Sequence, residues 1–169
     1  MRILRIFLFC LLGLAGLGAQ AQRTLVPIVS FENIPVTVAT EARLSSDDVR
    51  NAFLAAGEEA RWQMVPLGEG VLEGTYVKQN KHTIVVTIRY DAEKYSVLFK
   101  SSDNMNQRAS QYLPESVAAS AERKQRDLFV NRPESRYLKA DPQAVIHPFY
   151  EHWVYDLLER VRQRLKRAA

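Results

Sequence analysis

Residues 82–90, HTIVVTIRY, decide the fold of this chain, because apolar and polar side chains alternate along them almost without a break. One side of the stretch carries Ile84, Val86, Ile88 and Tyr90, and the intervening residues fall on the other side. Successive side chains of a β-strand point to opposite faces of a sheet. The stretch therefore predicts a strand with one buried face.

The alternation continues on both sides of this strand. Residues 71–78 alternate before it, residues 95–99 alternate after it, and short polar turns separate the runs. A fourth and shorter run at 62–65 stops at Pro66. Alternating strands joined by short turns predict a three- to four-stranded antiparallel meander with one solvated face.

Two amphipathic helices are expected to cover the buried face of that sheet. The first begins at Ser45, a serine N-cap followed by two acids at 47–48, and it ends near Ala60. The second runs from Pro148 to about Arg167 and has a continuous apolar stripe at three- and four-residue steps. These elements predict an α+β fold, a two-layer sandwich with an N-terminal helix, a meander and a long C-terminal helix.

The remaining segments are less regular. We interpret residues 22–44 as an extended N-terminal arm in which 34–38 is a candidate edge strand, since Pro35 cannot donate a ladder hydrogen bond. Residues 106–145 are polar and interrupted by prolines, and we interpret them as a partly helical insertion. The single α+β domain is therefore expected to span 45–169.

The first 21 residues have the three-part pattern of a secretory signal peptide. Arg2 and Arg5 precede a short apolar run, and the small residues of AQA at 19–21 suit cleavage after Ala21. The apolar run is too short to span a bilayer comfortably. We expect export to the bacterial periplasm, with secretion to the medium as the alternative.

Composition narrows the classes of function. The chain has 23 basic and 19 acidic residues, and removal of Arg2 and Arg5 leaves 21 basic residues against the same 19 acids. This small excess does not predict nucleic-acid binding. The single cysteine, Cys10, lies in the expected signal peptide, so the mature chain has no disulfide and no thiolate ligand. The mature chain has no second long apolar run, so we expect no transmembrane segment in it.

We expect no catalytic, metal or cofactor constellation. His82 starts a strand, and His147 and His152 are five residues apart, a spacing that points two side chains to different sides of a helix. The serine-rich strand end at 101–104 also fits ordinary turn chemistry. The last helix ends in cations that suit its dipole or, alternatively, contact with an anionic lipid surface: Arg160, Arg162, Arg164, Lys166 and Arg167.

Two segments together resemble a known group of proteins. Residues 82–105 contain Tyr-Asp, Tyr-Ser and Ser-Ser-Asp-Asn in succession, and residues 146–153 read Ile-His-x-x-Tyr-x-x-Trp. The chain is similar there to small bacterial envelope proteins, often described as lipoproteins, to which no activity is assigned. The chain departs from that group in lacking a lipid-attachment cysteine and in carrying the 106–145 insertion. The resemblance implies the fold and the compartment, and its motif positions form the candidate cluster: Tyr90, Ser102, Asn104, His147, Tyr150 and Trp153.

The leading hypothesis is a non-catalytic periplasmic module that binds a partner or helps to maintain the envelope. The candidate cluster then joins the last strand to the last helix structurally. The alternative is a small hydrolase or ligand-binding enzyme that uses Ser102, Asn104, His147 and Tyr150. A second alternative is a membrane-surface adaptor that acts through the basic end of the last helix. The expected partner is therefore another envelope protein or the membrane surface.

Overall fold

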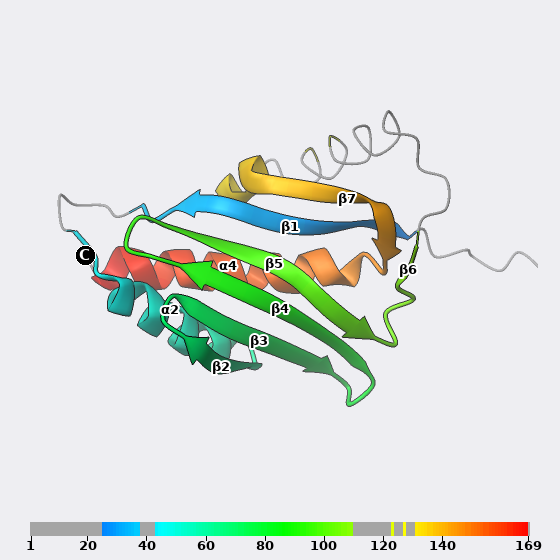
Figure 1. Cartoon of the computed structure of the whole chain (residues 1–169), viewed down its shortest axis with the longest axis horizontal. Helices are drawn as coiled ribbons and strands as arrows, with labels where there is room; N and C mark the ends of the chain where they lie inside the picture. The colour runs from blue at the N-terminus through cyan, green and yellow to red at the C-terminus, as the bar shows by residue number, and fades with distance from the viewer. Residues whose placement is uncertain (1–24, 38–42, 110–122, 124–126, 128–130, 169) are drawn as a thin grey trace, which may run out of the picture.

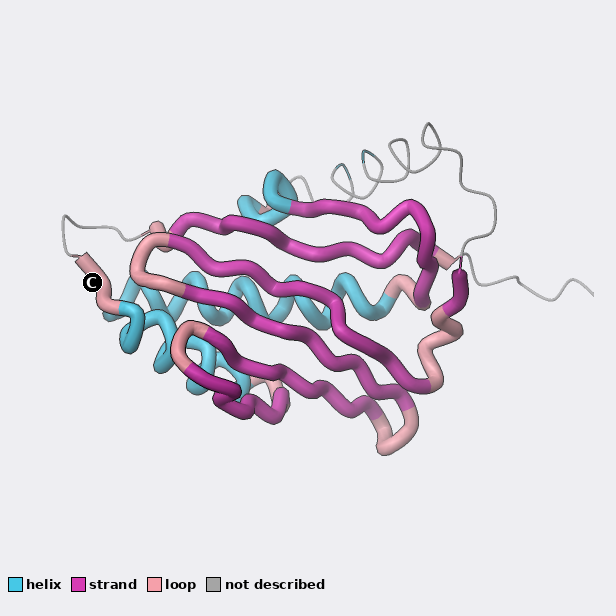
Figure 2. Tube along the Cα trace, in the orientation of Figure 1, coloured by secondary structure: helices cyan, strands magenta, loops and turns pink. Residues whose placement is uncertain are grey.

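The computed structural model describes residues 25–37, 43–109, 123, 127 and 131–168. The strands are β1 (Val26–Pro35), β2 (Trp62–Gly68), β3 (Val71–Lys78), β4 (His82–Tyr90), β5 (Lys94–Asp103), β6 (Arg108–Ala109) and β7 (Leu138–Ile146). The helices are α2 (Ser46–Glu59), α4 (Phe149–Ala168) and the short 3-10 helix η1 (Pro133–Tyr137). One seven-stranded sheet has the order β2-β3-β4-β5-β1-β7-β6, and every pairing in it is antiparallel. Helices α2 and α4 pack on one face of this sheet (Figures 1 and 2).

The predicted α+β fold is confirmed, and the meander forms the strands β2 to β5. Strand β4 pairs with β3 from His82 to Arg89, and its Ile84, Val86 and Ile88 side chains are fully buried. The tip of the β3–β4 hairpin is formed by Gln79 and Asn80, whose φ angles are 55° and 51°. Two successive positive φ values suit a tight turn within the three-residue connection between Lys78 and His82.

The two helices bury the faces that their apolar stripes predict. Ser45 begins α2 with a capping box, in which its side chain accepts from the Asp48 N–H while the Asp48 carboxylate accepts from the Ser45 N–H. The inner face of α4 is fully buried, and its Tyr155 ring meets the Phe31 ring of β1 edge-to-face at 4.9 Å between centroids. Burial of these aromatic and aliphatic side chains stabilises the two-layer arrangement.

Strand β1 differs from the expected N-terminal arm. It lies inside the sheet between β5 and β7, and its Val29 and Phe31 side chains are fully buried. The sequence pattern obscured this because the strand is irregular. Its register shifts after Pro27 and again after Phe31, and Asn33 has a φ of 56°. A strand with such bulges lacks the strict alternation from which strands are recognised.

Strand β7 corrects the limits of the expected insertion. Residues 138–146 belong to the sheet, where β7 pairs with β1 on one side and with the short β6 on the other. Residues 133–137 form η1. Residues 110–122, 124–126 and 128–130 lie outside the described residues, as do the expected signal peptide and cleavage site. Within the described part of the chain, no helix combines the length and apolar character that crossing a membrane requires.

Candidate functional site

The end of β5 and the start of α4 are joined by a backbone contact. Asn104 and Asn106 have φ angles of 54° and 53°, a left-handed conformation that asparagine adopts more readily than most residues. Between them, Met105 is buried, and its carbonyl oxygen accepts a hydrogen bond from the His147 N–H at 3.0 Å. These contacts fix the position at which the chain enters α4.

The β3–β4 hairpin is tied to the same junction. The His82 Nδ1 atom lies 2.7 Å from the Asn104 carbonyl oxygen, which can only accept, so we assign the ring proton to Nδ1. The Asn104 side-chain amide in turn donates to the Lys81 carbonyl oxygen at 3.1 Å. The hairpin tip, the end of β5 and the start of α4 therefore meet at one corner of the molecule.

His147 also caps the last helix. Its carbonyl oxygen accepts from the Tyr150 N–H at 3.1 Å, and its Nδ1 atom accepts from the Phe149 N–H at 3.2 Å. An accepting Nδ1 carries no proton, so we assign the neutral ring proton to Nε2. The first N–H groups of a helix have no partner within the helix, and His147 satisfies two of them.

A cavity of about 690 Å³ opens at this corner. Its volume lies in the usual range for small-molecule sites, roughly 300–1,000 Å³. Nine residues line it, from the hairpin, from the turn after β5 and from the start of α4: Lys78, Gln79, Lys81, His82, Met105, His147, Phe149, His152 and Trp153. The five-residue spacing of His147 and His152 does not act along one helix, because His147 precedes α4, as Pro148 led us to expect, and both histidines line this cavity.

A row of aromatic rings runs from the core to the cavity. Tyr76 lies between Trp62 and Trp153, with centroid distances of 5.4 Å and 4.9 Å. Trp153 in turn lies 6.0 Å from Phe149, whose side chain is 54% exposed. Aromatic side chains are common in the walls of ligand sites, so this exposed ring at the cavity suits ligand binding.

Only part of the candidate cluster lies at this cavity. His147 and Trp153 line it, and Asn104 holds its wall through the contacts with His82 and Lys81. Ser102 does not line it, and its hydroxyl donates to the Gln107 side-chain oxygen at 2.8 Å.

Tyr150 belongs to the core rather than to the cavity. Its side chain is fully buried, and its hydroxyl donates to the Val29 carbonyl oxygen of β1 at 2.7 Å. Its ring meets the Phe99 ring edge-to-face at 5.3 Å. Burial raises the pKa of the Tyr150 hydroxyl far above its ordinary value of 10.0. The hydroxyl is therefore a fixed structural donor.

Tyr90 lies at the opposite end of the sheet, where it pairs with Tyr95 next to the β4–β5 turn. A second, more open cavity of about 650 Å³ lies there. Its wall mixes acidic and basic residues, including Glu32, Arg89 and Lys94. The first cavity has basic residues and no acidic residue in its lining, whereas this cavity has both. We therefore centre the candidate site on the cavity at the start of α4.

The two hydroxyl groups of the candidate cluster are engaged in contacts away from this cavity. A serine nucleophile requires a base within hydrogen-bond reach and a third group that orients the base. The Ser102 and Tyr150 hydroxyls are committed to other partners, as described above. Among the described residues, no group of three or more His, Cys, Asp or Glu side chains is placed to hold a metal ion.

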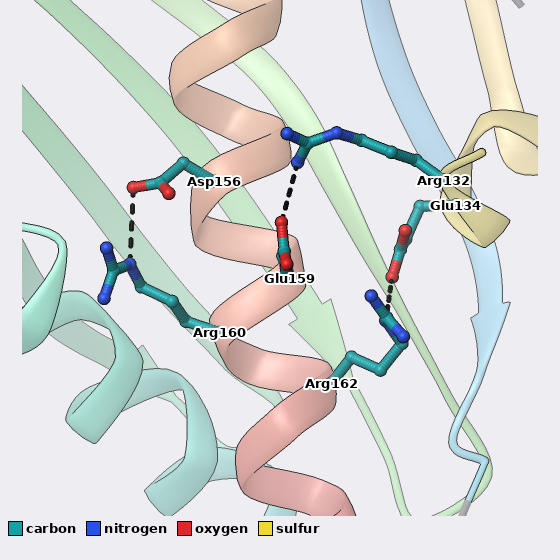
Figure 3. A network of polar contacts seen from close by, with 6 residues as sticks. All are labelled: Arg132, Glu134, Asp156, Glu159, Arg160 and Arg162. Atoms are coloured by element: carbon teal, nitrogen blue, oxygen red, sulfur yellow. Dashed lines mark hydrogen bonds and ion pairs between the residues drawn. The ribbon is translucent and has the colours of Figure 1, made fainter. Parts of the chain in front are cut away.

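The basic end of α4 is largely engaged in ion pairs (Figure 3). Arg160 lies 3.3 Å from Asp156, Arg162 lies 2.9 Å from the buried Glu134 of η1, and Arg164 pairs with Glu59 of α2. The Arg162 and Arg164 pairs link α4 to η1 and α2, whereas the Arg160–Asp156 pair lies within α4. Lys166 and Arg167, at the end of the helix, are exposed.

Seven of the nine lining residues lie outside the candidate cluster: Lys78, Gln79, Lys81, His82, Met105, Phe149 and His152. Lys78 and Lys81 flank the hairpin turn, and Phe149 and His152 lie in the first turn of α4. The only local signal was an exposed position for Phe149 in a stripe of buried aromatic residues. Their convergence depends on the sheet order, which brings the hairpin next to a helix almost seventy residues later.

The described residues define a class of protein: an α+β domain with a seven-stranded antiparallel sheet, two covering helices and a basic, aromatic cavity at one corner. No family model, curated protein or solved structure matches the chain. The function must therefore be argued from the site itself.

Proposed function

We propose that this protein is an exported, non-catalytic binding module whose ligand occupies the cavity between the β3–β4 hairpin and the start of α4. The observation that carries the proposal is the convergence of basic and aromatic side chains on that cavity. All three histidines and two lysines of the chain line it, together with Phe149 and Trp153. A mostly apolar pocket with a few convergent polar groups is the ordinary form of a ligand site.

The wall of the cavity is well supported by the fold. His82 is held by the Asn104 carbonyl oxygen, and His147 is held by backbone contacts with Met105 and the first turn of α4. Trp153 is packed against Tyr76. A site whose side chains are already held in place loses little conformational entropy when a ligand binds.

Export is proposed on the sequence of residues 1–21 alone. Expression of the full chain in a bacterium, followed by mass measurement of the periplasmic protein, tests it. The expected product begins at Gln22. Recovery of uncleaved protein from the cytoplasm would contradict export without bearing on the cavity.

Binding is tested with an uncharged fluorescent probe, N-phenylnaphthylamine, whose emission rises when it enters an apolar site. We expect saturable binding to the wild-type protein and about tenfold weaker binding to Phe149→Ala, because the exposed ring supplies apolar contact area. Leu67→Ala is the matched control, since Leu67 is 55% exposed and lies on β2, away from the cavity. Equal binding by the wild type and Phe149→Ala would refute the cavity as the site.

A further inference from the structure

The charge around the cavity is one-sided. Lys78, Lys81 and His82 line it from the hairpin, and His147 and His152 line it from the start of α4. None of the nine lining residues is an aspartate or glutamate. The chain as a whole has 23 basic and 19 acidic residues, so this bias is local and does not follow from composition.

The hairpin turn holds the backbones of the two lysines close together. The Lys81 N–H donates to the Lys78 carbonyl oxygen at 3.0 Å, which closes the turn. The Lys81 carbonyl oxygen is held by Asn104. The described contacts of the two lysines are made by their backbones, and both residues are exposed to solvent and line the cavity.

The opposite wall is apolar. Phe149 and Trp153 come from α4, where their separation of four residues places them on the same side of the helix. Met105 closes the cavity with a nearly fully buried side chain. The N-terminal end of α4 also faces this corner, and its partial positive charge favours an anion nearby.

We infer that the cavity binds an amphipathic anion, in which a carboxylate, phosphate or sulfonate group meets Lys78 and Lys81 and an apolar body lies against Phe149 and Trp153. This inference rests on the proposed function, because it names the class of ligand for the same cavity. A free small molecule and a membrane lipid can both present this chemistry, and the experiment below distinguishes them.

The test compares two probes that differ by one charged group. Anilinonaphthalene sulfonate carries an anion, and N-phenylnaphthylamine has the same two aromatic groups without it. We expect the sulfonate to bind the wild-type protein about tenfold more tightly at low salt, with an advantage that shrinks as salt screens the lysines. Equal affinities would overturn the inference while leaving the proposed function intact, and no binding of either probe would overturn both.

Charge reversal at the hairpin tests whether Lys78 and Lys81 cause the preference for the sulfonate. The double variant Lys78→Glu/Lys81→Glu should lose the advantage of the sulfonate while keeping its affinity for the uncharged probe. The matched control is Lys166→Glu/Arg167→Glu, which makes the same charge change at exposed positions at the far end of α4. An unchanged preference in the hairpin variant, or an equal loss in the control, would refute the role of the two lysines.

Competition identifies the source of the anion. Decanoate, a free amphipathic anion, should displace the bound sulfonate, whereas the uncharged decanol should displace it several-fold less well. Vesicles of phosphatidylglycerol serve as the membrane source and vesicles of phosphatidylcholine as their control. Displacement by decanoate alone supports a free ligand, and displacement by the anionic vesicles supports a lipid. Failure of every anion to displace the dye would overturn the inference.

Discussion

Glu151 should make the stability of this protein depend on pH in an unusual direction. The residue lies in the first turn of α4 and is only 3% exposed. Burial raises the pKa of its carboxyl from an ordinary value of 4.5 to about 8. The folded protein therefore holds a proton on Glu151 at neutral pH that the unfolded chain releases.

The sign of the effect follows from proton counting. Between about pH 4.5 and about pH 8 the folded state binds one more proton at this residue than the unfolded state does, so the free energy of unfolding falls as pH rises. Each pKa unit corresponds to about 1.4 kcal/mol, so at pH 7 the contribution lost is on the order of 3 kcal/mol. The contribution is fully present below about pH 4.5 and is exhausted above about pH 8.

Glu151→Gln removes the titration while keeping the size of the side chain. The difference in unfolding free energy between the variant and the wild type should therefore increase in favour of the variant from about pH 5 to about pH 8. Urea unfolding followed by circular dichroism at several pH values measures this difference. Glu58→Gln, at an exposed position of α2, is the control and should give a difference that stays flat. A flat difference for Glu151→Gln as well would show that the carboxyl is ionised in the folded protein, and the reasoning would fail.

Three further substitutions test contacts that hold the fold, each by urea unfolding at constant pH. Tyr150→Phe removes the hydroxyl that donates to Val29 and should cost about 1–2 kcal/mol; an unchanged unfolding midpoint would show that water replaces the bond. Ser45→Ala removes the N-cap of α2 and should cost about 1 kcal/mol, whereas a stabilised variant would contradict the capping geometry. Arg162→Ala leaves the buried Glu134 without its cation and should cost about 2 kcal/mol, and adding Glu134→Gln should recover part of that loss; no recovery in the double variant would refute the pairing.

The elements that the sequence predicted are those whose burial has a simple period. Strand β4 buries every second residue, and α4 buries residues at three- and four-residue steps, so each pattern has one dominant interpretation. Strand β1 could not be recognised in this way. Pro27 and the bulge between Phe31 and Ile34 break its alternation, although its side chains are as deeply buried as those of β4.

The site was less predictable than the fold because its residues are distant in sequence. Lys78 and Lys81 are typical turn-flanking residues, and nothing near them in sequence indicates a ligand. They become part of a site only because the meander places the β3–β4 hairpin beside the start of α4. The hydrophobic periodicity of a single segment cannot predict such a contact, because the contact depends on the order of strands in the sheet.

The segment from His147 to Trp153 contributes both to the core and to the wall of the cavity. Tyr150 faces the core, while Phe149, His152 and Trp153, at steps of three and four residues, line the cavity. His147 contributes to both, because it lines the cavity and also caps the helix. Loss of binding in His147→Ala would therefore not distinguish a ligand contact from a damaged helix start. Phe149→Ala separates the two, since the ring is 54% exposed and Phe149 takes part in the cap only through its backbone N–H, and it is the substitution on which the assignment of the cavity should be judged.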